Sequence, residues 1–407
     1  MFKNAKLITL FFTMVVVMIG FGIVIPIMPF YIENFGAGGA ELGAMMAVFS
    51  LMQFIFSPFW GALSDRYGRK SILLAGILGN ALSMLMMGLA GSFPILLLSR
   101  ALGGLLSSAT LPTAMAYISD STDEDNRGGG MGVIGAAMGV GMILGPGIGG
   151  WLSAHSLSTP FFAAAGMSLL AMLLIWRFLP ESLPEEMRSQ ETGRVRGVQI
   201  GVLWQALFGP MGFLLFLAFL VNFALASFEA VFGLYADMRF DYGPQQVGTI
   251  LMVVGLVSTL VQGLLTGPAT RWLGEATVIK LSLIASVLGF FLMTLFVQDT
   301  LVLLTVGFFV FSNAMLRPAI MSLASKLSTG GQGMALGLNN AFQSLGRVIG
   351  PLWAGLLLDL DVNLPYLSGA VIMLASFLYA MWAMQKSRLP AKAVRSPVPL
   401  RVELREK

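Results

Sequence analysis

The sequence predicts an all-α integral membrane protein with twelve transmembrane helices in two similar six-helix bundles, and three observations support this. First, 57% of the 407 residues are hydrophobic and only 11% are charged, whereas a soluble domain is usually about 25% charged. Second, the apolar residues form runs of roughly 20 residues, the length that a helix needs to cross a bilayer. Third, glycine, proline and charged positions recur in the second half of the chain at a nearly constant spacing.

Twelve apolar runs follow one another along the chain. Those of the first half lie at about 7–31, 42–63, 71–91, 93–119, 128–152 and 160–179. Those of the second half lie at about 207–236, 245–266, 276–297, 301–326, 331–358 and 364–386, with the weakest boundary after 326. We therefore predict bundles at 1–179 and 207–386, a cytoplasmic linker at 180–206 and a basic tail at 387–407. The first run has no small-residue cleavage site, so it is expected to be a retained span rather than a signal peptide.

Charged residues orient the predicted spans. If both termini are cytoplasmic, the outer loops hold a single cation, Arg239, against the carboxylates Glu33, Glu41, Asp237, Asp241, Asp299, Asp359 and Asp361. The inner segments hold nearly all of the remaining Lys and Arg, which is the asymmetry that the positive-inside rule demands. Both termini are therefore predicted to be cytoplasmic.

The composition also excludes several kinds of site and partner. Cysteine is absent and His155 is the only histidine, so disulfides, thiolate metal sites and histidine clusters are excluded. No metal and no cofactor are expected. The net charge of +4 reflects membrane topology rather than nucleic-acid binding, because the charges are sparse and confined to loops. The expected partner is the lipid bilayer, and the expected state is a monomer.

A polar turn after the second run marks an internal duplication. The glycines and charges of this turn are Gly61, Asp65, Arg66, Gly68, Arg69 and Lys70. A second copy spans Gly267–Gly274, 206 residues on, with Arg271 opposite Asp65. The pairs that share a spacing of 206 or 205 residues are Pro112 and Pro318, Asp120 and Lys326, and Gly145-Pro146 and Gly350-Pro351. These matches indicate two halves of like structure.

The charges around the first turn can form ion pairs at the inner ends of the helices. Asp65 caps the third run and can pair with Arg66 or Arg69. Asp120 closes the fourth run and Arg127 opens the fifth. Salt bridges among these groups would hold the helices together on the cytoplasmic side and break when the protein opens inward. The alternative is an ordinary basic loop anchored to lipid headgroups.

The fifth run is rich in glycine between 139 and 150. Gly145, Gly147 and Gly150 satisfy the pattern G-x-G-x-x-G, but a nucleotide site of that kind needs a preceding strand and a soluble βαβ unit. Within a membrane helix the same glycines permit close helix packing, and Pro146 bends the helix. We therefore predict a kinked fifth span at the interface between the halves.

Four charged residues interrupt the apolar runs: Arg100, Glu229, Arg317 and Arg347. Each costs roughly 2.5–3.5 kcal/mol on insertion scales, so each is a candidate to face an aqueous cavity. Glu229 is the only carboxylate well inside a span, and it could bind a proton or a cationic substrate alternately. For each of the four, the alternative is a structural ion pair or an arginine that reaches the interface.

Uncharged polar and aromatic residues accompany these charges within the runs. The polar ones are Gln53, Asn222, Asn313, Asn339, Asn340 and Gln343, and the aromatic ones are Phe49, Phe54, Phe228, Phe232 and Phe342. An apolar, aromatic cavity with a few polar groups and one acid suits lipophilic and often cationic molecules.

These patterns resemble those of the major facilitator superfamily, and within it the twelve-span drug:proton antiporters. The resemblance rests on the loop motif Gly61–Lys70, on Arg100 in the fourth run, and on a fifth-run motif of Gly141, Gly145, Pro146, Gly149 and Gly150 that is typical of exporters. It covers about residues 7–386. It is nearest to bacterial multidrug exporters that confer quinolone resistance, through Ile25-Pro26, Phe228-Glu229 and Leu316-Arg317-Pro318-Ala319.

The resemblance implies the major facilitator fold and a role for individual residues. Asp65, Arg69, Asp120 and Arg127 would form an inner gate, and Arg100 and Glu229 would couple transport to protons. The residues that would line the substrate cavity are Ile25, Phe49, Gln53, Glu229, Phe232, Arg317 and Asn340. Because Arg271 stands where the motif has Asp, the gate of the second half is expected to differ from that of the first.

The function predicted on these grounds is proton-coupled export of lipophilic, often cationic drugs by alternating access, in the inner membrane of a bacterial cell. The alternative is a proton-coupled symporter or exporter of a sugar, amino acid or organic anion. The exporter-type fifth run and the sparsely polar interior argue against it. A membrane enzyme or receptor is disfavoured, because the sequence shows no nucleophile–base pair, metal ligand set or soluble catalytic domain.

Overall fold

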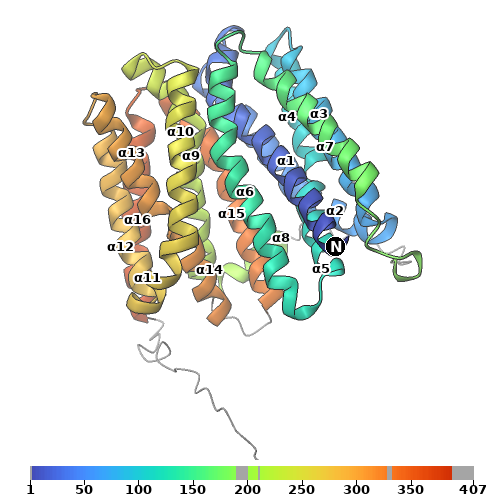
Figure 1. The fold of residues 1–407 in the computed structure, drawn as a ribbon. Coiled ribbons are helices and arrows are strands. Elements are labelled where there is room, and N and C mark those ends of the chain that lie inside the picture. Colours follow the sequence, from blue (N-terminus) through green and yellow to red (C-terminus); the bar gives the residue numbers. More distant parts are fainter. Residues whose placement is uncertain (1, 189–199, 210, 328–331, 387–407) are drawn as a thin grey trace, which may run out of the picture.

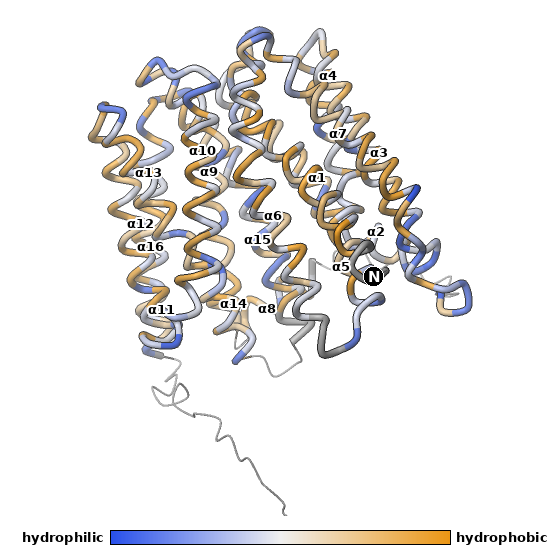
Figure 2. The backbone as a smooth tube through the Cα atoms, in the orientation of Figure 1, coloured by the Kyte–Doolittle hydropathy of each residue, from blue (hydrophilic) through white to orange (hydrophobic). Residues whose placement is uncertain are grey.

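The computed structural model describes residues 2–188, 200–209, 211–327 and 332–386. Within these residues the chain is helical, and twelve segments are long and apolar enough to cross a membrane. The twelve-span all-α prediction is therefore confirmed. Figure 2 shows hydrophobic residues along the bodies of the helices and hydrophilic residues at their ends.

The first bundle contains α1 (Phe2–Glu33), α2 (Gly39–Tyr67), α3 (Arg69–Gly88), α4 (Phe93–Ser107), α5 (Thr110–Ser121), α6 (Glu124–Leu152) and α7 (Thr159–Phe178). A 3-10 turn η1 (Glu185–Met187) and a short helix α8 (Ile200–Leu207) follow. The second bundle contains α9 (Gly212–Phe240), α10 (Pro244–Leu260), the π-helical turn η2 (Val261–Leu265), α11 (Thr266–Leu273), α12 (Glu275–Met293), α13 (Asp299–Ala314), α14 (Leu316–Leu327), α15 (Gln332–Leu358) and α16 (Leu364–Lys386).

The two bundles lie side by side (Figure 1). We call the end that carries α8 and the turns after α2, α5 and α11 the linker end, which is the lower end in Figure 1. The other end, where the turns after α1, α3, α6, α9, α12 and α15 lie, is the hairpin end.

Proline breaks one span at the same place in each bundle. α4 ends at Ser107 and α5 begins two residues before Pro112, whereas α13 ends at Ala314 and α14 begins two residues before Pro318. A proline cannot donate a backbone hydrogen bond, and its ring clashes with the carbonyl four residues earlier, so it is best accommodated in the first turn of a new helix. The matched prolines therefore produce matched breaks.

Further pairs of contacts show that the duplication extends through the fold. The hydroxyl of Tyr31 donates to the carbonyl of Met87 at 2.9 Å, and that of Tyr235 donates to the carbonyl of Met293 at 2.8 Å. The tyrosines are 204 residues apart and the methionines 206. Equivalent positions on α1 and α9 are therefore 204 residues apart. Ile25 of the first bundle is the position equivalent to Glu229 of the second.

The glycines of α6 allow it to contact one helix of each bundle closely. A Cβ on Gly141 or Gly145 would lie 2.3 Å from the Met18 side chain or 2.8 Å from Gly22 of α1. A Cβ on Gly150 would lie 2.6 Å from the Pro244 carbonyl of α10. Contacts this short are possible only for glycine, so the small residues explain how the backbones approach one another.

The helix pair α2 and α15 joins the two bundles in a similar way. A Cβ on Gly43 would lie 2.3 Å from the carbonyl oxygen of Pro351. At the hairpin end, both carboxylate oxygens of Asp359 accept hydrogen bonds of 2.8 Å, from the N–H groups of Gly39 and Ala40. These N–H groups begin α2 and have no partner within that helix, so a carboxylate from the other bundle satisfies them.

At the linker end of the first bundle, Arg69 joins two carboxylates. Its guanidinium lies 2.5 Å from Asp65 and 2.9 Å from Asp120. The carboxylate of Glu181 accepts hydrogen bonds from the N–H groups of Arg69 and Lys70 at the start of α3. Gly68 has φ +93°, and a Cβ there would lie 2.4 Å from Glu181, so this position requires glycine. We call Asp65, Arg69, Asp120 and Glu181 the first-half latch.

Other residues of the predicted gate lie apart from this latch. Arg66 is exposed and lies over the Tyr67 ring, 5.4 Å from its centroid. The amine of Lys70 donates to the carbonyl of Trp176 at 2.9 Å. The Arg127 side chain lies outside the described residues, so its predicted role is not tested.

The second bundle has an equivalent latch with the charges inverted. Glu275 is 206 residues after Arg69 and Lys326 is 206 after Asp120, and the two form an ion pair. The Ser322 hydroxyl also donates to Glu275 at 2.9 Å. We call Glu275, Ser322 and Lys326 the second-half latch. Arg271 is exposed and donates to the carbonyl of Gly267, outside this latch.

The inversion changes how each latch interacts with its helix ends. A helix N-terminus favours a negative charge and a C-terminus a positive one. Glu275 at the start of α12 and Lys326 at the end of α14 satisfy both preferences. Arg69 at the start of α3 and Asp120 near the end of α5 oppose them, and in the first bundle Glu181 supplies the negative charge that the start of α3 favours.

We predict that Glu275→Gln and Lys326→Gln each destabilise the second bundle by about 2 kcal/mol, the usual contribution of a hydrogen bond to a charged group. The apparent Tm of the purified protein in detergent measures this. Arg271→Gln is the matched control, because it removes an exposed charge from the same turn, and its Tm should equal that of the parent. A drop for Arg271→Gln as large as for the other two would contradict the assignment.

Candidate functional site

A cavity of about 660 Å³ lies between the two bundles. Among the described residues that line it, those of the first bundle are all apolar: Ile25, Gly135, Ala136, Met138, Gly139, Met142 and Pro146. The polar ones all belong to the second bundle: Glu229, Ser258, Thr259, Gln262, Asn313, Arg317 and Gln343. The cavity thus has one entirely apolar wall. The opposite wall, which we call the polar wall, carries all the polar groups, set among apolar residues such as Leu251 and Val254. An amphiphilic molecule fits between such walls.

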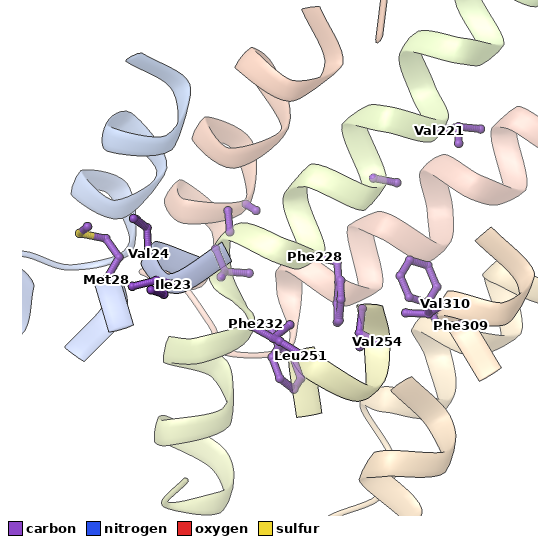
Figure 3. Packing of buried hydrophobic residues seen from close by; sticks show 14 of the residues in the cluster. Ile23, Val24, Met28, Val221, Phe228, Phe232, Leu251, Val254, Phe309 and Val310 are labelled. Carbon is purple, nitrogen blue, oxygen red and sulfur yellow. The ribbon is translucent and has the colours of Figure 1, made fainter. Parts of the chain in front are cut away.

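Glu229 lies within α9 and is the only carboxylate among the described lining residues. The adjacent Phe228 is 1% exposed, and its ring packs against Phe232 and Phe309 with centroids 5.2 Å apart in each case. Figure 3 shows Phe228 and Phe232 among the buried residues of the second bundle, close to Leu251 and Val254. These rings anchor α9 in the core, so that the half-buried Glu229 faces the cavity.

Two arginines interact with Glu229 without pairing with it. Arg317, in the first turn of α14, lines the cavity, and Arg347 of α15 donates to the Ser344 hydroxyl at 3.2 Å. Both interact electrostatically with Glu229. However, no ion pair within 4.0 Å joins the carboxylate to either of them in the part of the chain that the structure describes. The carboxylate is therefore free to exchange one partner for another.

Arg100 lies elsewhere, inside the first bundle. Its guanidinium carbon is 4.2 Å from the centroid of the Phe49 ring, and its Nη2 contacts the sulfur of Met46 at 3.6 Å. Its Nε is buried and has no partner among the described residues. The structure therefore does not bring Arg100 and Glu229 together at the cavity, and the predicted coupling role of Arg100 stays a prediction.

Of the seven predicted cavity residues, Ile25, Glu229 and Arg317 line the cavity. Phe49 and Phe232 are buried, Gln53 is half-buried and Asn340 is exposed, and none of these four is among the residues that line it. Their contact with substrate stays a prediction.

The π-helical turn η2 is a feature that the sequence reasoning missed. The N-caps of α2 and α10, Gly38 and Gly243, are 205 residues apart, whereas the C-caps Gly68 and Gly274 are 206 apart. The second copy of this span therefore contains one extra residue, which η2 accommodates. The change of spacing was readable in the sequence, and η2 itself contributes Gln262 and Gly263 to the cavity wall.

Comparison with known proteins gives concordant results. The family model for the Major Facilitator Superfamily matches residues 10–315 and 259–406. Multidrug resistance protein 1 of Bacillus subtilis (strain 168) is 36% identical over 366 residues, 89% of this chain and 92% of its own. Quinolone resistance protein NorA of Staphylococcus aureus (strain COL) is 30% identical over 383 residues, 91% of this chain and 96% of its own.

Solved structures agree in fold. A mutant of the nucleoside transporter NupG matches with a TM-score of 0.78, 15% sequence identity, and coverage of 93% of this chain and 99% of its own. The human organic anion transporter MFSD10 matches with a TM-score of 0.70 and 23% identity, covering 93% of this chain and 99% of its own. At these identities the likeness concerns the fold alone.

Because the chain contains no cysteine, single cysteines can test which side chains face the cavity. We predict that Glu229→Cys and Arg317→Cys react with a charged, membrane-impermeant maleimide in detergent, whereas Phe232→Cys does not, since Phe232 is 1% exposed. Labelling is read by mass shift, with the parent as the unlabelled control. Equal labelling of Phe232→Cys would contradict the placement of these side chains.

Proposed function

This chain belongs to the Major Facilitator Superfamily, and from that premise we propose that it is a multidrug efflux transporter that exchanges lipophilic, often cationic compounds for protons. The observation that carries the proposal is Glu229, a single unpaired carboxylate on the polar wall of a cavity whose other wall is apolar, among the residues that the structure describes. The resemblance in sequence to multidrug and quinolone resistance proteins supports the same substrate class.

Transport proceeds by alternating access in a bacterial inner membrane. The glycine contacts of α2 with α15 and of α6 with α10 hold the bundles together, and Asp359 caps α2 across the interface at the hairpin end. The cavity reaches along α6 and η2 toward the linker end, through Gly135 and Gly263. We place the linker end and both termini in the cytoplasm, because the basic residues gather there. The described state is then open inward.

Glu229 couples the two fluxes because it can hold only one partner at a time. When ionised it attracts a cationic substrate, and when protonated it releases that substrate and becomes neutral. The return of the empty carrier is favoured when the acid is neutral, since an unpaired charge inside the membrane is costly. Arg100, buried in the first bundle, is proposed as a second coupling residue on the strength of the sequence motif alone.

The membrane potential contributes about 2.3 kcal/mol per charge per 100 mV. One proton moving inward would sustain roughly a 50-fold gradient of a neutral substrate at that potential. Exchange of one proton for one monovalent cation moves no net charge, so only the pH difference would drive it.

Import or export of a sugar or a similar small metabolite is the alternative on the same fold. A sugar site would be surrounded by hydrogen-bonding side chains, because each buried hydroxyl needs a partner. The described part of the first bundle contributes an entirely apolar wall, which favours the lipophilic substrate class.

We predict that Glu229→Gln abolishes proton-driven transport of a lipophilic dye cation into everted vesicles, because the amide can neither release a proton nor form an ion pair with the cation. Glu186→Gln, the same change on an exposed linker residue, is the matched control and should transport at the parental rate. Dye fluorescence after an imposed pH step measures both. Parental transport by Glu229→Gln would refute the exchange scheme.

We further predict that collapsing the membrane potential with valinomycin and potassium slows export of a neutral substrate and leaves export of a monovalent cation unchanged. Nigericin, which collapses the pH difference, should stop export of the cation and only slow export of the neutral substrate, because the potential still drives the latter. The measurement is initial efflux in proteoliposomes under each ionophore. Equal sensitivity of both substrates to valinomycin would rule out one-for-one exchange.

A further inference from the structure

The polar wall of the cavity contains an amide that proton exchange at Glu229 does not use. Asn313 lies in the last turn of α13, the first helix of the broken span, and lines the cavity although it is only 2% exposed. Its Nδ2 makes no hydrogen bond with any residue that the structure describes. Buried amide groups are almost always hydrogen-bonded, and an unsatisfied one lowers stability. Because Asn313 lies at the wall of the cavity, a molecule bound there is placed to supply the missing partner.

A comparison with other buried amides supports this reading. Asn222 of α9 is 3% exposed and donates to the carbonyl of Ala218 at 3.0 Å. Asn80 of α3 is 5% exposed and donates to the Ser168 hydroxyl at 2.9 Å. Neither lines the cavity. The fold therefore gives the donor group of each of these two amides a partner, and among the described residues it leaves the donor of Asn313, at the cavity wall, without one.

The residues around Asn313 define what it would bind. The proline break places Arg317 one turn further along, at the start of α14, and it lines the same wall. The Arg317 guanidinium is a donor only, and the unpaired Nδ2 of Asn313 is a donor as well. This part of the wall therefore offers two donors to an acceptor, while Glu229 offers an acceptor to a cation.

We propose that Asn313 and Arg317 form an acceptor-binding subsite, which hydrogen-bonds a carbonyl or carboxylate oxygen of a substrate whose cationic group interacts with Glu229. This inference rests on the proposed function and narrows its substrate class. Asn313 becomes the residue that distinguishes lipophilic cations that carry an acceptor from those that do not. The apolar wall of the first bundle, which begins at Ile25 and continues along α6, receives the hydrocarbon face of either kind.

Two phosphonium ions of equal charge isolate the subsite. Tetraphenylphosphonium has no hydrogen-bonding group, and (4-acetylphenyl)triphenylphosphonium adds one ketone acceptor. Calorimetric titration of each into the purified full-length protein in lipid nanodiscs gives two dissociation constants. We expect the ketone to bind the parent protein about 5- to 100-fold more tightly than tetraphenylphosphonium. Equal affinities in the parent would overturn the proposal without any variant.

Asn313→Leu then removes the donor while keeping a branched side chain with the same number of heavy atoms. The affinity for the ketone should fall to that for tetraphenylphosphonium, which itself should change less than about two-fold. The Tm of the ligand-free variant should not fall, because leucine replaces an amide whose donor had no partner. Asn222→Leu is the matched control: it should lower Tm, because the side-chain hydrogen bond to the Ala218 carbonyl is lost, and it should preserve the preference for the ketone.

The remaining outcomes separate this inference from the proposed function. If Asn313→Leu weakens both cations equally, Asn313 acts through structure and the subsite is refuted. If neither cation binds the parent protein, the proposed function itself is refuted. If Glu229→Gln loses both cations while Asn313→Leu loses only the preference for the ketone, both proposals stand.

Discussion

Direct contact between helix backbones across the two bundles is the constraint on which the rest of the structure depends. In lipid there is no hydrophobic force to join two apolar helices, so association relies on close packing. Gly43 against Pro351 and Gly150 against Pro244 provide it, with space for no side chain at either contact. These contacts hold α2 on α15 and α6 on α10, and so fix the two bundles between which the cavity lies.

The internal duplication is visible in the helix scaffold but not in the polar residues that line the cavity. The matched tyrosines, the matched proline breaks and the two latches repeat in both bundles. The polar wall of the cavity does not repeat among the described residues. At the position equivalent to Glu229 the first bundle has Ile25, and both line the cavity from opposite sides. One half thus carries all the polar groups among the described lining residues, and the other contributes an apolar surface.

The second-half latch shows that an ion pair can keep its place in the fold when its charges are exchanged, although the interaction of each charge with its helix end then changes sign. The Coulomb attraction within the pair does not depend on which residue carries the negative charge. A helix N-terminus, however, favours an anion and a C-terminus favours a cation. Glu275 and Lys326 agree with their helix ends, whereas Arg69 needs Glu181 from the linker nearby. The first-half latch is therefore tied to the segment that joins the bundles, and the second is self-contained.

The sequence by itself determined the twelve spans, the duplication and the charged turn, because run length, spacing and neighbouring charges are local properties. It left Arg66 and Arg69 as possible partners of Asp65, and the structure selects Arg69. The inverted pair Glu275–Lys326 and the π-turn were also present as spacings, although they were not recognised. Only the tertiary structure decided which polar residues reach the cavity. Asn313 does and Gln53 does not, since the rotation of each helix about its axis is set by packing against distant segments.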